Sequence, residues 1–263
     1  MTDDYVLFNI EDDVATITLN EPERLNPWSE PMRQGVLQAV KEARENQPRC
    51  LVIQGAGDAF SAGGDVDQMR GMINTADPYE RTTEIEEEIL PAIREIVRFP
   101  APVIAKIDGP AAGLGANLAI ACDILLASEN AIICFAFANV GVSVDGGTSG
   151  LLPKIVGLNI AKEMVFKGEI VDAERAHDLG IFNHVYPDEE FDERAQEEID
   201  EIASGPTIAQ KTAKRLLDDG ATKSIERALI DEAYYAAGPV STHDHEEGVD
   251  AFLEDRDPEF KGE

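Results

Sequence analysis

Cysteine is scarce in this sequence, and the few cysteines show no pattern that would make a cross-link or a metal site. The 263 residues include three of them, Cys50, Cys122 and Cys134, each inside an apolar run. An odd, unclustered set fits neither a disulfide framework nor a zinc site. We therefore predict three reduced cysteines in the core.

Positive charge is also scarce: 22 Lys and Arg stand against 52 Asp and Glu, which gives a net charge of −30. Such a charge repels nucleic acids and anionic membranes, so we expect neither as a partner. The acids are spread along the whole chain, and their mutual repulsion would be screened at about 1 M salt, where the Debye length is about 3 Å. The composition favours a halophilic protein over an ordinary acidic one.

Long uninterrupted apolar runs are absent. The longest, from Ala111 to Ala127, is broken by Asn117 and Asp123, so it does not predict a membrane span. The first residues, MTDDYVLFNI, carry acids where a secretory signal needs positive charge. We expect a cytoplasmic protein, of a length that suits one domain of enzyme size or two small ones.

Short β-branched runs alternate with helical patterns in the first half of the chain, which predicts an α/β core. The pattern after about residue 147 is almost entirely helical, except for a strand from Ile181 to Tyr186. We predict a core over residues 1–188 and a helical C-terminal region over 189–263. The predicted strands lie near residues 6–10, 14–20, 49–55, 102–109, 122–128 and 131–135, and the helices near 29–46, 78–98 and from 113 onward.

Two glycine-rich segments each follow a predicted strand. The first, QGAGDAFSAGGDV, fails the dinucleotide-binding pattern because Phe60 stands where glycine is required, and Asp65 there is placed to cap the next helix. The second, DGPAAGLGANLAIACD, leads into a helix whose first amides are free. Two such turns could form an oxyanion hole, or Gly113 and Gly115 could serve only close helix packing.

The sequence resembles the crotonase (enoyl-CoA hydratase/isomerase) superfamily over nearly its whole length. The matching segments are LNEPERLNPWS, AFSAGGDV, IDGPAAGLGANLAIACDILLAS, VGVSVDGGTSGLLPKIVG, HDLGIFNHVYP and EEGVDAFLEDRDPEFKG. The resemblance implies a spiral of strand–strand–helix units with a C-terminal helical region that forms trimers, often paired into hexamers. It also implies an acyl-CoA thioester as substrate, with no cofactor beyond the coenzyme A of that substrate.

The same resemblance implies the residues of the site. The oxyanion-hole amides match Ala62 and Leu114, whose N–H groups would bind the thioester carbonyl. The two catalytic glutamates of family hydratases are replaced by Asn117 and Phe137, neither of which transfers protons. We expect both to line the substrate pocket, where Asn117 could position a water or hydrogen-bond the acyl chain. Asp145 stands where several isomerases and a dehalogenase of the family carry their catalytic aspartate, although an aspartate before Gly-Gly could also be a helix cap.

The resemblance places the coenzyme A contacts at Arg24, Phe260 and Lys261, the last two reaching a neighbouring subunit. Arg24 and Lys261 could equally be solvated surface cations. Glu84 or Glu88 could supply a second carboxylate, although a solvated acidic helix face explains them as well.

Histidines do not form a metal motif. His243 and His245 are two residues apart, so they point to different sides of a helix, and His177 and His184 are expected to be structural. We predict no metal site.

These observations together predict an acyl-CoA isomerase that shifts a double bond, or rearranges an activated ring, through a thioester enolate, with Asp145 carrying the proton. The alternatives are an enoyl-CoA hydratase or acyl-CoA hydrolase of the same family. A third reading, from another class, is a non-catalytic acyl-CoA-binding or scaffold protein.

Overall fold

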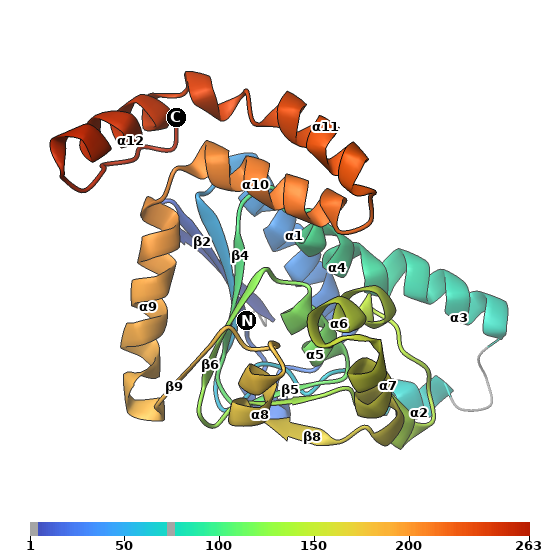
Figure 1. Ribbon diagram of the computed structural model, residues 1–263. Helices are drawn as coiled ribbons and strands as arrows, with labels where there is room; N and C mark the ends of the chain where they lie inside the picture. Colours follow the sequence, from blue (N-terminus) through green and yellow to red (C-terminus); the bar gives the residue numbers. More distant parts are fainter. Residues whose placement is uncertain (1–4, 73–76) are drawn as a thin grey trace.

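Two β-sheets lie at the centre of the computed structural model, which describes residues 5–72 and 77–263 (Figure 1). The larger sheet has the strand order β1-β2-β3-β4-β6-β9, and the smaller has the order β5-β7-β8. The strands are β1 (Val6–Glu11), β2 (Val14–Leu19), β3 (Cys50–Gly55), β4 (Val103–Ile107), β5 (Pro110–Ala112), β6 (Ile124–Ser128), β7 (Ile132–Cys134), β8 (Ile170–Asp172) and β9 (His184–Tyr186).

Strand pairing in the larger sheet is parallel from β2 to β9, and only the hairpin of β1 and β2 is antiparallel among the pairs of that sheet. Asp12 and Asp13 form the hairpin turn with positive φ angles of 48° and 62°, a conformation that aspartate tolerates. The predicted strands are confirmed, and the α/β class with them. The sequence missed β5 and β8, which have three residues each and are too short to show alternation.

Helices join the strands and then dominate the C-terminal part. They are α1 (Glu30–Asn46), α2 (Val66–Met72), α3 (Pro78–Glu84), α4 (Leu90–Val97), α5 (Leu114–Ile120), α6 (Thr148–Val156), α7 (Leu158–Lys167), α8 (Ala173–Asp178), α9 (Asp188–Ser204), α10 (Thr207–Gly220), α11 (Ile225–Tyr235) and α12 (His243–Glu254). The helix predicted over residues 78–98 is α3 and α4 joined by one π-helical turn, Ile85–Ile89.

The main core lies between one face of the larger sheet and helices α1 and α4. Helix α1 buries Val36, Val40 and Ala43, which recur every three or four residues and so form one apolar stripe. They pack in the same cluster as Ile17 and Leu51 from the sheet. Each fully buried aliphatic side chain of this kind contributes roughly 1.5–3 kcal/mol, so this packing fixes the strand ends that carry the glycine-rich turns.

Helix α9 covers the opposite face of the larger sheet. Its buried residues Phe191, Ala195 and Ile199 are four residues apart and join a second core cluster with Cys50 and Leu126 of the sheet. The predicted C-terminal region begins one residue after the start of α9, yet this helix packs as part of the body. The predicted division between residues 188 and 189 therefore falls in the first turn of α9 and not at a boundary of the core.

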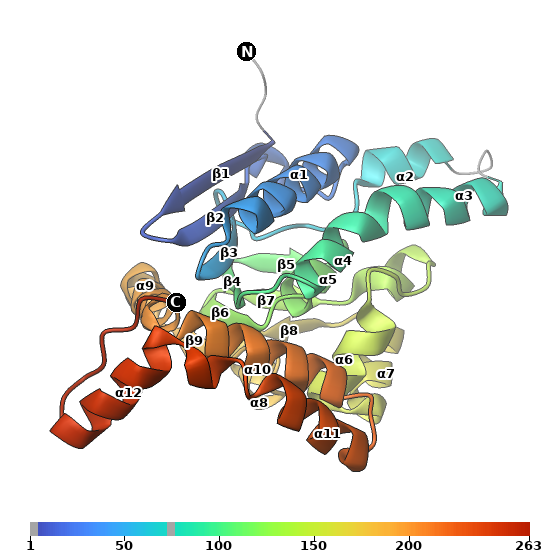
Figure 2. The same ribbon diagram turned by 90° about the horizontal axis from the view of Figure 1, so that it is seen from above.

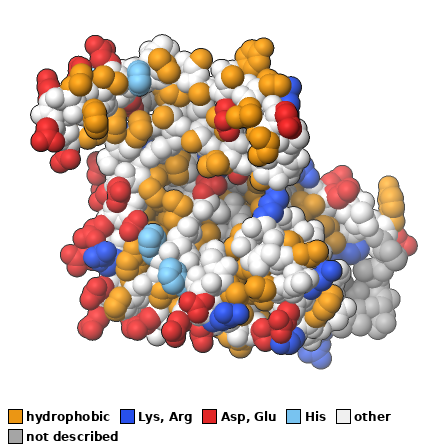
Figure 3. Space-filling model, in the orientation of Figure 1, with side chains coloured by type: hydrophobic (Ala, Val, Ile, Leu, Met, Phe, Trp, Pro, Cys, Tyr) orange, Lys and Arg blue, Asp and Glu red, His pale blue; other side chains and the backbone are white. Residues whose placement is uncertain are grey.

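Helices α10 to α12 extend along one side of the molecule, away from the smaller sheet (Figures 1 and 2). They expose large apolar side chains, among them Phe252 at 86%, Tyr234 at 78% and Leu253 at 75%. Orange patches mark apolar side chains along these helices in Figure 3, with acidic side chains beside them and along the outline below. Exposed apolar area of this extent is typical of a surface that another protein covers.

Cys50, Cys122 and Cys134 are buried and form no disulfide, which confirms the prediction of reduced core residues. Burial raises the pKa of Cys50 to about 12, with a smaller contribution from the charge of Asp200. In the described part of the chain, we find no helix with the length and hydropathy needed to cross a bilayer.

Candidate active site

The two glycine-rich segments lie directly against each other. Ser61 N–H donates to the Pro110 carbonyl at 3.0 Å, and Ala112 N–H returns a bond to the Ser61 carbonyl at 2.9 Å. A Cβ atom on Gly63 would lie 2.3 Å from the Ala112 carbonyl oxygen, and Gly63 has a φ of +88°. Glycine is required here both for the close approach and for the left-handed conformation.

Close packing also explains Gly115, because a Cβ atom there would lie 2.5 Å from the Ser61 carbonyl oxygen. Gly113 is different. It has a φ of +50°, and a Cβ atom there would reach no atom nearer than 4.0 Å, the Cα of Gly63. Close helix packing therefore accounts for Gly115, whereas Gly113 supplies the left-handed turn by which the chain enters helix α5.

The Ala62 N–H cannot serve as predicted, because it donates to the Leu25 carbonyl at 2.8 Å within the fold. The free amides near this turn belong to Gly64 and Leu114, neither of which has a hydrogen-bond partner among the described residues. A Cβ atom on Gly64 would be 4.0 Å from Cδ1 of Leu114, so the two residues are neighbours. We correct the first oxyanion-hole candidate from Ala62 to Gly64.

Leu114 is the first residue of α5, where the positive end of the helix dipole favours a negatively charged oxygen. Its N–H lies at the position that the sequence predicted. Together, the two amides give the kind of donor pair that stabilises an oxyanion.

Asp145 is half-buried, and its carboxylate receives a hydrogen bond from Asn117 Nδ2 at 3.3 Å. Burial raises the pKa of Asp145 above the ordinary aspartate value, partly opposed by the charge of Arg81 and by a backbone hydrogen bond. The helix-cap alternative does not describe this carboxylate: α6 has no side-chain cap, and Thr148 N–H donates to the backbone carbonyl of Asp145 at 3.0 Å.

Asn117 is completely buried on α5 and uses both ends of its amide to hold the Asp145 turn. Its Nδ2 also donates to the Asp145 carbonyl at 3.0 Å, and its Oδ1 accepts from Thr148 Oγ1 at 2.5 Å. Gly146 has room for no side chain, since a Cβ atom would lie 2.5 Å from Asn117 Nδ2. Asn117 therefore positions Asp145, with both ends of its buried amide engaged within the fold.

Phe137 is 6% exposed and belongs to the main apolar core. Position 137 thus supplies packing and no acid or base.

The two glutamates considered as a second carboxylate are both in ion pairs. Glu84 lies 2.6 Å from Arg81 on α3, and Glu88 lies 3.1 Å from the buried Arg33. Each of these carboxylates therefore has an arginine as its partner within the fold.

Arg24 is bound to Asp65, the residue after Gly64, at 3.0 Å and to Glu21 at 2.8 Å. These hydrogen bonds raise the pKa of Arg24. Asp65 also accepts from Gln68 N–H at 3.2 Å, which confirms it as a cap of α2. Arg24 thus stays close to Gly64, with part of its charge already neutralised.

Phe260 and Lys261 are close in sequence to the C-terminus, Glu263, and the C-terminus lies away from α5 and α6 in both ribbon views (Figures 1 and 2). Asp244 of α12 accepts from the N–H groups of Lys261 and Gly262 at 2.7 and 2.9 Å, and Arg49 binds the Phe260 carbonyl at 3.3 Å. Within one chain, therefore, the structure does not bring these two residues to Asp145.

Histidine and carboxylate side chains form no group of three or more that could hold a metal ion in the part of the chain that the structure describes. His177 Nδ1 lies 3.0 Å from the Phe182 carbonyl, a structural contact.

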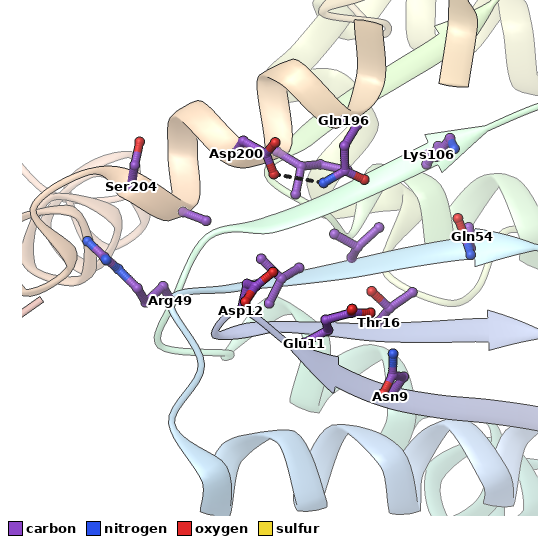
Figure 4. Close-up of a pocket in the computed structure, with 14 residues that line it drawn as sticks. Asn9, Glu11, Asp12, Thr16, Arg49, Gln54, Lys106, Gln196, Asp200 and Ser204 are labelled. Atoms are coloured by element: carbon purple, nitrogen blue, oxygen red, sulfur yellow. Dashed lines mark hydrogen bonds between the residues drawn. The ribbon is translucent and has the colours of Figure 1, made fainter. Parts of the chain in front are cut away.

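A cavity of about 610 Å³ lies elsewhere, between the sheet and α9 (Figure 4). Its two cations are already engaged: Arg49 donates to the Gly205 carbonyl at 2.7 Å, and Lys106 lies 2.5 Å from Asp192. In Figure 4, Asp200 is bound to Gln196 rather than pointing at a common centre with the other polar side chains. This cavity offers no free amide pair and no acid–base constellation.

The fold and the paired glycine turns bring two backbone amides without a partner among the described residues, those of Gly64 and Leu114, close to each other in an α/β protein. Residues 9–263 match the family model of enoyl-CoA hydratase/isomerase, and the chain belongs to this family. It is 33% identical over 260 residues to a 1,2-epoxyphenylacetyl-CoA isomerase of Escherichia coli, covering 98% of this chain and 99% of that protein.

Other relatives carry the name of a hydratase. A probable enoyl-CoA hydratase of Rhodobacter capsulatus is 33% identical, with 98% of each chain covered. The crystal structure of an enoyl-CoA hydratase from Polaromonas superposes with a TM-score of 0.90 at 29% identity, covering 97% of this chain and 99% of that one. These matches confirm the predicted superfamily. Because the relatives include both isomerases and hydratases, they do not decide which of the two reactions this protein catalyses.

Proposed function

We propose that this protein is an acyl-CoA isomerase that moves a carbon–carbon double bond along the acyl chain. The observation that carries the proposal is a single half-buried carboxylate, Asp145, held by Asn117 three residues after the free amide of Leu114 on α5. The acid–base group and one oxyanion donor therefore belong to one rigid unit.

In the proposed reaction, the thioester oxygen accepts hydrogen bonds from the N–H groups of Gly64 and Leu114. Asp145 takes a proton from the α carbon, and the negative charge passes to the thioester oxygen as an enolate. The protonated Asp145 then returns the proton to the γ carbon while the double bond shifts, so that no proton is gained or lost overall. A carboxylate whose pKa is raised by burial is a stronger base at the pH where it works.

Hydration is the alternative, and some relatives carry that name. Water addition in this family relies on two glutamates. Position 117 carries instead an amide that is already hydrogen-bonded to Asp145 and Thr148, and position 137 carries a buried apolar ring. Hydrolysis of the thioester would meet the same lack of a second base. A non-catalytic acyl-CoA-binding role is disfavoured by the position of Asp145.

The test is Asp145→Asn, which keeps the size of the side chain but removes the base. We expect isomerisation of a 3-enoyl-CoA to fall by about 10²–10⁴-fold, with acyl-CoA still bound, and exchange of the α proton with deuterium to stop. The matched control is Asp178→Asn, on an exposed residue of α8. Wild-type exchange in Asp145→Asn would sink the proposal, and faster hydration of a 2-enoyl-CoA than isomerisation by the wild type would favour the hydratase.

We also propose that the chain assembles into trimers or hexamers, as the resemblance implies. The exposed apolar side chains of α11 and α12 support this assembly. Phe260 and Lys261 would then complete the coenzyme A site of a neighbouring subunit, together with Arg24 of that subunit. Coenzyme A enters as part of the substrate, and the proposed reaction needs no further cofactor.

Two proposals concern the setting in which the protein works. The net charge of −30 supports adaptation to a salt-rich environment, and the three buried cysteines without a disulfide support a cytoplasmic location.

A further inference from the structure

A groove of about 350 Å³ lies between α4 and α6, and it begins at the two glycines that follow Asp145. Its lining combines only three kinds of residue. The aliphatic side chains of Leu90, Ile93, Val97 and Leu151 form the floor. The cations are Arg94, Arg98 and Lys154, and the glycines, which leave space, are Gly146, Gly147 and Gly150.

The spacing of these residues explains why they share one surface. On α4, Leu90, Ile93, Arg94 and Val97 are separated by three or four residues, so they lie on one helix face. The same face is therefore apolar and cationic at once.

None of the three cations forms an ion pair with a carboxylate of the described residues. The charge of Lys154 acts on Asp218, where it opposes the rise that burial causes in the pKa of that carboxyl, whereas Glu95 is paired with Arg44 at 2.9 Å. Arg94 of α4 and Arg98, the residue that caps its C-terminus, are four residues apart, a spacing at which like charges repel. In a chain with 52 acids, three cations around one groove whose lining contains no acid favour an anionic ligand.

We propose that this groove binds a carboxylate at the end of a hydrocarbon chain. The chain would lie on Leu90, Val97 and Leu151, and the carboxylate would bind the guanidinium groups and Lys154. A volume above about 300 Å³ is within the range of small-molecule sites. The groove offers no aromatic ring, hydroxyl or amide side chain to bind a base or a ribose, which disfavours the nucleotide end of coenzyme A.

Two molecules carry this chemistry: a free fatty acid, and an acyl-CoA whose acyl group ends in a carboxylate. The groove starts beside Asp145, so an acyl chain on the proposed active site could reach it; only this second source rests on the proposed function. Binding of a free acid tests the groove without any reaction.

The binding experiment is calorimetry with decanoate, and with decanol as the uncharged probe. In Arg94→Gln/Arg98→Gln we expect decanoate to bind about tenfold more weakly or worse, while decanol binding is unchanged. The control Lys41→Gln/Lys162→Gln removes the same charge from two exposed, unpaired lysines elsewhere, and we expect less than a twofold change.

A second variant tests the apolar floor. A Cβ atom on Gly150 would meet nothing within 4 Å, so Gly150→Leu adds a side chain to the groove without a clash of its first carbon and should block both probes. Decanoate affinity that is equal in wild type and the double Gln variant overturns the proposal. So does an absence of decanoate binding in the wild type together with an altered sedimentation coefficient in the double variant, since a second copy would then fill the groove.

Turnover distinguishes the two sources. If the carboxylate belongs to the substrate, the double Gln variant should raise KM about tenfold for an enoyl-CoA that ends in a carboxylate and leave a methyl-ended one unchanged. If both KM values are unchanged while decanoate binding is lost, the ligand is a free acid. If the protein turns over neither substrate but binds decanoate, the proposed function is refuted while the proposal for the groove stands.

Discussion

Replacing Asn117 by aspartate would place a second carboxylate against Asp145, and the result is predictable from one contact. Asn117 Nδ2 lies 3.3 Å from Asp145 Oδ1. Two unit charges at that distance repel by about 5 kcal/mol at an effective dielectric constant of about 20, an upper bound that corresponds to about four pH units. Asp145 is half exposed, so solvent screens part of this repulsion, and we expect a shift of about two units in the pKa of one member of the pair.

The sign of the effect on stability follows from the raised pKa. A carboxyl group whose pKa is higher in the folded state than in the unfolded state binds more protons when folded. Its contribution is fully present below the unfolded value of about 4 and is lost as the pH rises through the folded value. Asn117→Asp should therefore melt close to the wild type at pH 4.5 and well below it at pH 8.

Thermal melts from pH 4.5 to pH 8 measure this difference. Asn139→Asp is a matched control, because Asn139 also donates to a backbone carbonyl, that of Gly168 at 2.8 Å, without contacting Asp145. A melting temperature of Asn117→Asp that follows the control at every pH would refute the contact between Asn117 and Asp145, and with it the positioning of the proposed base.

Three further predictions test the turns, the charge and the coenzyme A contacts. Gly63→Ala should lower stability by at least about 2 kcal/mol in denaturant melts, because of the clash with Ala112 and the positive φ, whereas Gly71→Ala in α2 should not lower it, since a Cβ there meets nothing within 4 Å. Circular dichroism should show structure gained on moving from dilute buffer to molar KCl, and equal stability at both would remove the halophilic proposal. Arg24→Ala and Lys261→Ala should raise KM for the CoA ester with kcat nearly unchanged, as for binding shared by ground and transition states; a lowered kcat at constant KM would contradict the assignment.

Much of the fold could be predicted because apolar periodicity is a local property of the chain. The helix from Ser29 to Asn46 and the parallel strands stand out in this way. The strand Ile170–Asp172 could not be found, because it consists of three residues at the edge of the smaller sheet with Ile170 68% exposed. Its pairing with β7 is a tertiary contact that no local pattern records.

The choice of backbone amide for the oxyanion hole likewise depends on tertiary contacts that a sequence motif does not record. A motif identifies the segment FSAGGD, but it does not say which N–H the turn leaves free. That depends on Leu25 and Asn26, whose left-handed conformations with φ of 59° and 52° bring the Leu25 carbonyl to Ala62. A non-glycine residue in this conformation is uncommon, so no local pattern predicts it.

Asn117 stands where family hydratases carry a glutamate, and its role in this structure is to hold the Asp145 turn. Its amide satisfies the Asp145 carbonyl, the Asp145 carboxylate and the Thr148 hydroxyl at once. An apolar side chain at this fully buried position would remove all three of these bonds, and only the Asp145 carbonyl and the Thr148 hydroxyl would keep each other as partners, at 2.9 Å. A glutamate could not donate to the carboxylate when ionised and would repel it. An aspartate at position 145 and an amide at position 117 are therefore coupled choices, and this coupling is the physical reason why we assign the proton transfer to one carboxylate.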